Sequence, residues 1–502
     1  MSLIGIDVGT SATKAAAYDC RGLLLATTNE SIAARHPCPG AWELDPEEVW
    51  QAASRVLRRL TQAEALRRDP PASMAISASA REAFPVDADG RALGPCMMAG
   101  DTRASERWMK LLSETCSPEQ WIRSCSHLPE RMDPVCRLLW WRENRPEIMA
   151  RARYFWGWHE FLTFRMTGRA VTDPGLAARW LVYDLDSRDW SPQRLAQFGV
   201  APAMLPTIQT WGTVAGTVAP SPAAELGLPT HLKIGMGTLD AACSALGAGV
   251  VSPGTAALVS GSWEDLVVPV NSSLPVDVLL RTNLTGGPHP GPGGTVMYSL
   301  SPNGTAVVDW ARNLLGISLE SLDADLQASD LGPSPVLAVP HLSGTMLLRE
   351  RAGRTGGALL GLTLASSKTE LMKALMEGIA YDLCQAAAVM RASGVSIGCL
   401  RAVGGGARLA WWTQLKSDLL MTPIELVNQP QPGTLGAALL GGLAVGAFSS
   451  LEQAAREFVK VERRFEPDTQ RAGLHAERLA AYKAAVGELL RLNWSGPVGA
   501  SG

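Results

Sequence analysis

The sequence predicts an α/β protein of two domains with a mixed sheet, and three observations lead to this prediction. The chain has 502 residues, more than one hydrophobic core usually serves, and 46% of them are hydrophobic while 19% are charged. Hairpin-like strand pairs at the start of the chain are followed by a helix pattern. A similar hairpin returns near the middle, so we expect two related domains at residues 1–245 and 246–502.

The N-terminal hairpins show as apolar runs separated by turn residues. Residues 3–6 are apolar, residues 7–11 form a polar turn, and strand character returns at residues 13–18. Residues 19–22 predict a second turn into the apolar run at residues 23–25. Three strands joined by hairpins are therefore expected.

The first helix is predicted from its start signal. Asp45 can act as the N-cap, Pro46 takes the first helical position, and Glu48 completes a capping-box pattern. Apolar residues then recur at helical spacing from Val49 to Leu60. Hairpins followed by such a helix favour a mixed sheet covered by helices.

The hairpin of the second half has the same order of elements. Residues 251–254 turn into a strand at 256–259, residues 260–262 form a Ser-Gly-Ser turn, and a strand follows at 266–268. The boundary between the domains is placed just before this hairpin.

Composition excludes several classes of function. A formal net charge of −3 argues against a nucleic-acid binder, because such proteins carry a basic surplus. The nine cysteines form no Cys-x-x-Cys pair, which argues against a zinc ribbon or disulfide framework and favours a reducing cytoplasm. No secretory signal or run of 18 apolar residues occurs, so no membrane association is expected.

The turn at residues 7–11 combines a carboxylate, a glycine and two hydroxyls. Its amide groups and the hydroxyls of Thr10 and Ser11 could hold phosphate oxygens, and Asp7 could hold Mg²⁺. Lys14 could reach the same phosphate or point to solvent. An ordinary polar β-turn is the alternative.

Asp240 follows Gly235 and Gly237 and precedes a helical run of small residues at 241–247. We expect it to project from a flexible loop at a helix start. It could serve as a general base for an alcohol, since phosphoryl transfer needs an acceptor for the hydroxyl proton. The alternative is a simple helix N-cap.

Three glycines at residues 404–406 follow a predicted strand at 400–403 and precede a helix. Because glycine has no side chain, a flat ring could lie against the backbone of these three residues. A tightly packed strand-to-helix turn is the alternative. The chain has no P-loop, dinucleotide fingerprint, zinc-peptidase motif or nucleophile elbow, which removes the main support for those classes.

In order along the chain, these segments resemble the FGGY family of carbohydrate kinases. The resemblance spans nearly the whole chain and rests on the segments at 7–11, 361–364, 373–378, 404–407 and 433–438. It implies an actin-like, ribonuclease H-like ATPase fold with a cleft between two domains. The nucleotide is then expected on the C-terminal domain, and the sugar mainly on the N-terminal one.

The resemblance also implies roles for single residues. Asp240 matches the catalytic base and contacts the substrate, and Asp7 matches the carboxylate associated with magnesium. The residues that match the ATP-binding turns are Thr10, Ser11, Lys14, Gly261, Ser262, Gly405, Gly406 and Ala407.

The expected substrate site departs from the common family pattern. Arg81 and Glu82 resemble the pair of glycerol kinases and of the autoinducer-2 kinase, and they suit a polyhydroxylated chain. A surface ion pair is the alternative. Ala99 replaces a tryptophan of the family, so the pocket is expected to be roomier, and Ala241 replaces a polar residue, which removes a usual polar contact. Trp263 is also unusual and could shield the phosphates.

Together these features predict Mg²⁺- and ATP-dependent phosphorylation of a small sugar or polyol in the cytoplasm. A non-catalytic, actin-like ATP-binding regulator and a sugar-independent ATPase are the alternatives. The expected partner is the small-molecule substrate, with a homodimer as one option for assembly. The sequence leaves the sugar and the phosphorylated hydroxyl open.

Overall fold

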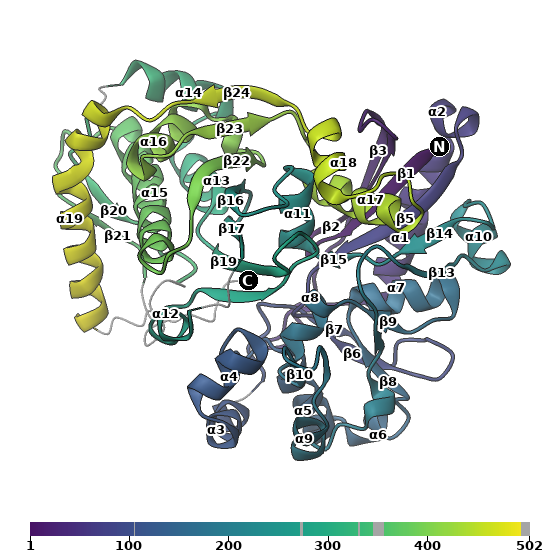
Figure 1. The fold of residues 1–502 in the computed structure, drawn as a ribbon. Helices are drawn as coiled ribbons and strands as arrows, with labels where there is room; N and C mark the ends of the chain where they lie inside the picture. The colour runs from purple at the N-terminus through teal and green to yellow at the C-terminus, as the bar shows by residue number, and fades with distance from the viewer. Residues whose placement is uncertain (105, 272–274, 330–331, 345–355, 493–502) are drawn as a thin grey trace.

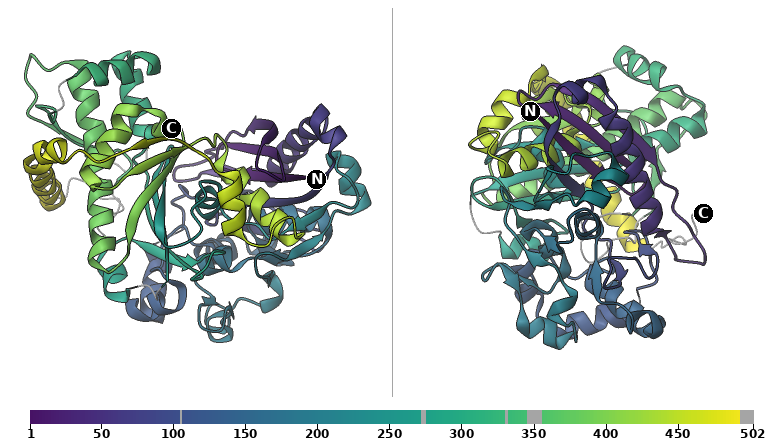
Figure 2. Two further views of the ribbon diagram at one scale, coloured as in Figure 1. Left: turned by 45° about the horizontal axis from the view of Figure 1, so that its top comes forward. Right: turned by 90° about the vertical axis from the view of Figure 1, so that its right-hand side faces the viewer.

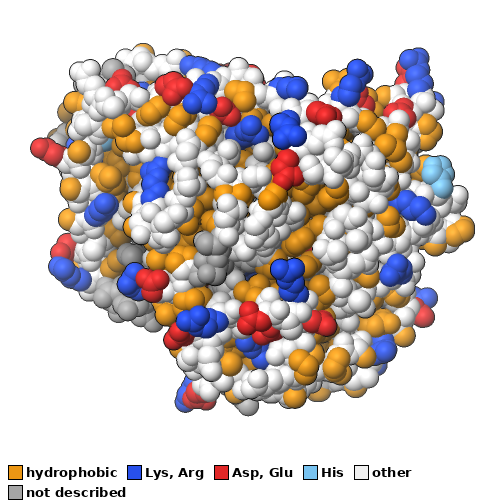
Figure 3. Space-filling model, viewed as in Figure 1, with side chains coloured by type: hydrophobic (Ala, Val, Ile, Leu, Met, Phe, Trp, Pro, Cys, Tyr) orange, Lys and Arg blue, Asp and Glu red, His pale blue; other side chains and the backbone are white. Residues whose placement is uncertain are grey.

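The computed structural model describes the 502-residue chain except for residues 105, 272–274, 330–331, 345–355 and 493–502 (Figure 1). Its main elements are two sheets, one in each half of the chain, with helices beside and between them. Within the described residues, no helix is long and apolar enough to cross a membrane. Charged side chains of both signs are interspersed over the face seen in Figure 3.

The first sheet is mixed, as the sequence predicts. Its central strand β1 (Ser2–Val8) pairs antiparallel with β2 (Ala12–Asp19) and parallel with β5 (Pro71–Ala78). The remaining strands of this sheet are β3 (Leu24–Ser31), β13 (Val214–Thr217), β14 (Lys233–Gly235) and β15 (Thr238–Leu239). The three predicted N-terminal strands are confirmed.

The second sheet has seven strands, and its centre is again a hairpin beside a parallel strand. The predicted hairpin is formed by β16 (Gly254–Ser260) and β17 (Glu264–Val270), and β16 also pairs with β22 (Ile397–Val403). The outer strands are β18 (Thr285–Pro288), β19 (Thr295–Ser301), β23 (Ile424–Val427) and β24 (Val461–Phe465).

Two small-residue helices lie between the sheets (Figures 1 and 2). They are α11 (Asp240–Gly247) and α17 (Pro432–Ala444), which contact each other closely, and α17 also covers β1 and β5. A Cβ on Gly5 would stand 1.7 Å from the Thr434 carbonyl oxygen, so only glycine permits this approach. The late part of the chain thus completes the core of the first sheet, while the boundary near 245 stays a prediction.

Helix α1 (Pro46–Thr61) begins where the sequence predicts. Asp45 is its N-cap, and its Oδ1 accepts a hydrogen bond of 2.9 Å from the Glu47 amide. The predicted capping box is wrong, because the Glu48 carboxylate forms an ion pair with Arg35 and does not reach back to the cap.

The other helices form two groups. The helices of the second half include α13 (Thr305–Leu315), α14 (Leu319–Ala328), α15 (Lys368–Ala392), α16 (Ala410–Leu420) and α19 (Thr469–Leu492). Short helices between residues 106 and 204 form a lobe below the first sheet (Figure 1), among them α4 (Pro118–Cys125), α5 (Pro134–Asn144), α7 (Trp158–Thr167) and α8 (Pro174–Ala177). This lobe contributes Glu130, Met132 and Arg179 to the cavity described next.

Candidate active site

A cavity of about 420 Å³ lies between the two halves of the molecule. The ends of β1 and β5, the start of α11 and the β16–β17 hairpin all reach it. Nine of the predicted site residues line it: Asp7, Thr10, Ser11, Lys14, Arg81, Glu82, Asp240, Gly261 and Ser262. The fold therefore brings residues from both halves of the chain to one place.

The first loop joins β1 to β2 at the edge of this cavity. The Gly9 amide donates to the Ala12 carbonyl at 3.0 Å and closes the turn. Asp7 Oδ1 accepts a hydrogen bond of 2.6 Å from the Ser77 hydroxyl, and burial raises the pKa of Asp7. Lys14 lies opposite Asp7 in the strand register and lines the cavity, so the solvent-facing alternative is wrong.

Asp240 is the first residue of α11 and follows the short strand β15. Thr238 and Leu239 pair with Ser77 and Ala78 of β5, so the expected flexible loop is instead held in the sheet. The helix cap is Leu239, and Asp240 Oδ1 accepts from the Ala241 amide at 2.7 Å. The N-cap alternative is therefore wrong. Burial, reinforced by the negative charge of Asp7, raises the pKa of Asp240 to about 7.

A buried carboxylate that the sequence analysis missed anchors the strand before Asp240. Asp173 Oδ1 accepts from the Thr238 hydroxyl at 2.7 Å, the Gly175 amide at 2.8 Å and the Trp211 indole at 3.1 Å. Burial raises the pKa of Asp173 to about 7. The Asp-Pro start of α8 was the available signal, but it indicates a helix cap and not a contact with residue 238.

The second loop joins β16 to β17. The Gly261 amide donates to the Trp263 carbonyl at 2.9 Å, and the Gly261 carbonyl accepts from the Thr305 amide at 2.8 Å at the start of α13. Ser262 lines the cavity beside Gly261, and so does Trp263, whose side chain is partly exposed. Behind this loop, the buried Lys416 ammonium lies 2.6 Å from the Glu264 carboxylate.

The glycine turn at 404–406 lies next to the second loop but not in the cavity wall. It connects β22 to α16 through a short 3-10 turn at Gly406–Arg408. Gly404 has a φ of 93°, and a Cβ there would stand 2.5 Å from the Ser260 carbonyl oxygen. The proposed contact of Gly405, Gly406 and Ala407 with adenosine stays a prediction.

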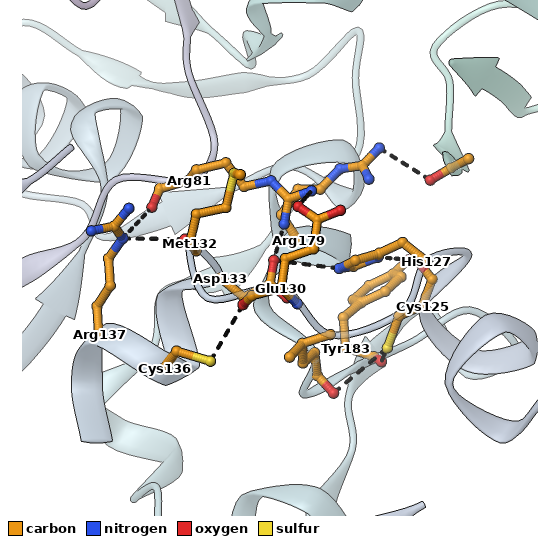
Figure 4. A network of polar contacts seen from close by, with 12 residues as sticks. Arg81, Cys125, His127, Glu130, Met132, Asp133, Cys136, Arg137, Arg179 and Tyr183 are labelled. Atoms are coloured by element: carbon orange, nitrogen blue, oxygen red, sulfur yellow. Dashed lines mark hydrogen bonds and ion pairs between the residues drawn. The ribbon is translucent and has the colours of Figure 1, made fainter. Parts of the chain in front are cut away.

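Arg81 and Glu82 both line the cavity, but their side chains do not pair with each other. Glu82 is buried, and its Oε2 accepts from the Arg81 backbone amide at 3.0 Å. The Arg81 guanidinium forms ion pairs with Glu130, at 3.1 Å, and with Asp133 (Figure 4). The surface ion-pair alternative is therefore wrong.

Buried Arg137 holds the Arg81 segment in place. Its guanidinium donates to the backbone carbonyl of Arg81 at 2.7 Å (Figure 4) and to that of Met98 at 2.7 Å. The partners of Arg81 are missing from the sequence prediction because they lie about 50 positions away and belong to no recognised motif.

Further residues complete the cavity wall. Ala99 and Ala241 line it with small side chains. Polar residues that the sequence gave no reason to select also line it: Glu130, Arg179, Asp265, Asn283 and Thr285. Three of these come from β17 and from the segment around β18, so the second half contributes more to the cavity wall than its hairpin loop alone.

Comparisons with known proteins agree with this architecture. The model of the N-terminal domain of the FGGY family of carbohydrate kinases matches residues 2–247, and that of its C-terminal domain matches residues 256–445. The chain is 28% identical over 491 residues to the xylulose kinase of Escherichia coli, which covers 97% of this chain and 99% of that protein. It is 26% identical over 516 residues to the autoinducer-2 kinase of Klebsiella pneumoniae, covering 98% and 95%.

A solved structure shows the same fold. The crystal structure of xylulose kinase from Rhodospirillum rubrum superposes with a TM-score of 0.87 at 23% identity, covering 98% of this chain and all of that one.

Proposed function

Since the chain belongs to the FGGY family of carbohydrate kinases and is an ATP-dependent carbohydrate kinase, we propose that Asp240 is the general base that takes the proton of the acceptor hydroxyl. The observation that carries this proposal is the position of Asp240. Its buried carboxylate lines the same cavity as both candidate phosphate loops. We further propose that the acceptor is a small sugar or polyol, because Arg81 and Glu82 offer charged donors and acceptors for hydroxyl groups.

In this mechanism the acceptor O–H bond breaks and its proton moves to Asp240 as the acceptor oxygen bonds to the γ-phosphorus of ATP. The bond between that phosphorus and the bridging oxygen breaks, and ADP leaves. Amide groups and hydroxyls of the loops at Thr10, Ser11, Gly261 and Ser262 would hold the phosphate oxygens. Closure of the cavity would exclude water and protect ATP from hydrolysis.

Asp7 fits a role beside Mg²⁺. It is a carboxylate on the cavity wall, and the hydroxyl of Ser77 donates a hydrogen bond to its Oδ1. No group of three or more His, Cys, Asp or Glu side chains among the described residues could hold a metal ion. A single carboxylate with phosphate and water ligands is the usual arrangement for Mg²⁺, which when bound supplies positive charge beside the phosphates.

The proposed acceptor depends on the residues that depart from the usual pattern of the family. The relatives named above are kinases of xylulose and of autoinducer-2, whereas the pair at Arg81 and Glu82 and the small Ala99 depart from the usual ketopentose pattern. We propose a polyhydroxylated acceptor and leave its length to experiment. Cytoplasmic location and a homodimer likewise stay predictions.

The first test measures ADP release with and without a panel of ketoses, alditols and glycerol. We expect at least one acceptor to stimulate release well above the rate with Mg²⁺–ATP alone. Constant hydrolysis without stimulation would support the ATPase alternative. No release across a broad panel, together with measurable ATP binding, would support the non-catalytic regulator.

The pKa of Asp240 predicts how activity depends on pH. Burial favours the neutral acid, so the base becomes ionised only as pH rises through about 7. We expect kcat/KM for the acceptor to rise about tenfold per unit below pH 7 and to level off above it. Thermal melting measured over the same range controls for unfolding, and a flat profile from pH 5.5 to 8 would contradict this assignment.

A further inference from the structure

One buried cation in the cavity wall has no role in the mechanism above. Arg179 lies just after α8, lines the cavity, and is only 3% exposed. Its Nη2 donates to the Gly286 carbonyl at 3.0 Å, and its guanidinium lies 5.3 Å from the centre of the Tyr298 ring. The other terminal nitrogen, Nη1, is buried without a hydrogen-bond partner among the described residues.

Arg179 differs from its neighbour Arg81 in this respect. The Arg81 guanidinium is neutralised by Glu130 and Asp133, whereas Arg179 forms no ion pair within the described part of the chain. Figure 4 shows the two arginines side by side around Glu130. Burial, together with the charge of Arg81, lowers the pKa of Arg179 to about 10, so it remains a cation at neutral pH.

The position of Arg179 is fixed by the same scaffold that holds the catalytic base. Asp173 caps α8, the helix immediately before Arg179, and also binds Thr238 in the strand before Asp240. A Cβ on Gly287 would stand 3.3 Å from Nη2, so the β18 backbone leaves little freedom to the guanidinium. A buried, immobilised donor without a partner is costly unless a ligand supplies an acceptor.

We propose that Arg179 binds the phosphoryl acceptor, with Nη1 donating a hydrogen bond to one of its oxygen atoms. This inference rests on the proposed sugar kinase activity and adds a specificity-determining residue to it. Either a hydroxyl or a carbonyl oxygen can accept such a bond.

The charges around Arg179 identify the class of acceptor. Five carboxylates line the cavity and only three cations do: Asp7, Glu82, Glu130, Asp240 and Asp265 against Lys14, Arg81 and Arg179. A sugar acid would bring a further carboxylate beside these five acidic groups, where burial already raises the pKa values of Asp7, Asp240 and Asp265 and so disfavours additional negative charge. The acceptor is therefore an uncharged sugar or polyol, held by Arg179 as a hydrogen-bond donor and not as a counter-ion.

The test compares Arg179→Gln and Arg179→Lys with the wild type on the best acceptor of the panel. We expect Arg179→Gln to raise the acceptor KM about 10- to 100-fold, since it removes a charged donor, while kcat and the KM for ATP change less than about threefold. The acceptor KM of Arg179→Lys should lie between those of the wild type and Arg179→Gln, because lysine keeps the positive charge but lacks the planar guanidinium group.

Arg194 provides a matched control outside the cavity. It too is buried, donates to a backbone carbonyl, that of Tyr183 at 2.9 Å, and lies 5.0 Å from an aromatic ring, that of Trp121. Arg194→Gln should lower the melting temperature without changing the acceptor KM. An unchanged acceptor KM in Arg179→Gln would overturn the role of Arg179.

A second arm tests the charge of the acceptor with matched pairs, such as xylitol with xylonate and glucitol with gluconate. We expect the uncharged member of each pair to have the higher kcat/KM, and a preference for the acids would overturn the assignment of an uncharged acceptor.

The outcomes distinguish the proposed kinase activity from the proposed role of Arg179. If no compound of either kind stimulates ADP release, the proposed kinase activity fails, whereas stimulation without dependence on Arg179 contradicts only this inference.

Discussion

Asp240→Asn should lower kcat by about 10²- to 10⁴-fold while ATP still binds with nearly wild-type affinity. The amide keeps the size of the carboxyl group and can still accept the Ala241 amide hydrogen bond, so the start of α11 should stay intact. It cannot take up the acceptor proton. ADP release at saturating acceptor measures kcat, and calorimetric titration measures ATP affinity.

Asp265 offers the matched control for this substitution. It also lines the cavity as a buried carboxyl group, and burial together with Asp240 raises its pKa well above the ordinary range. This shift favours the neutral acid, and Asp265→Asn keeps the size and polarity of the side chain. We expect Asp265→Asn to lower kcat much less than Asp240→Asn does. Near wild-type turnover in Asp240→Asn would remove Asp240 from the role of base.

Local patterns were sufficient to predict the elements that position the two candidate phosphate loops. The β1–β2 and β16–β17 hairpins depend on apolar runs and turn residues within a few positions of each other, and both are confirmed. The glycines at 404–406 likewise predicted a turn between a strand and a helix. In each case the information lies within about ten residues.

The errors arise where a distant partner determines the local structure. Glu48 forms an ion pair with Arg35 instead of closing a capping box. The glycines at 235 and 237 predicted a loop before Asp240, but Thr238 and Leu239 pair with β5 and form a short strand. Asp173 and Arg179 carry no motif, because their importance comes from contacts with residues more than 60 positions away. Burial and partners of this kind can be read only from the tertiary structure.

The buried ion pair behind the loop between β16 and β17 leads to the largest expected loss of stability. Lys416 Nζ lies 2.6 Å from Glu264 Oε1, 3.0 Å from the Ser260 hydroxyl and 3.4 Å from the centre of the Trp412 ring. Burial lowers the pKa of Lys416, while the Glu264 carboxylate opposes this shift. Lys416→Met should therefore lower the free energy of unfolding by about 3–5 kcal/mol, because it leaves Glu264 charged and buried without its cation.

The double variant Lys416→Met/Glu264→Leu distinguishes the cost of an unpaired charge from a loss of packing. With both charges gone, the site becomes apolar, and pairs replaced in this way are often neutral or even stabilising. We expect urea unfolding, followed by circular dichroism, to show the double variant far closer to the wild type than Lys416→Met. Equal destabilisation of the two variants would show that the ammonium acts through its contact with Trp412 and the loop at Ser260, and not through Glu264.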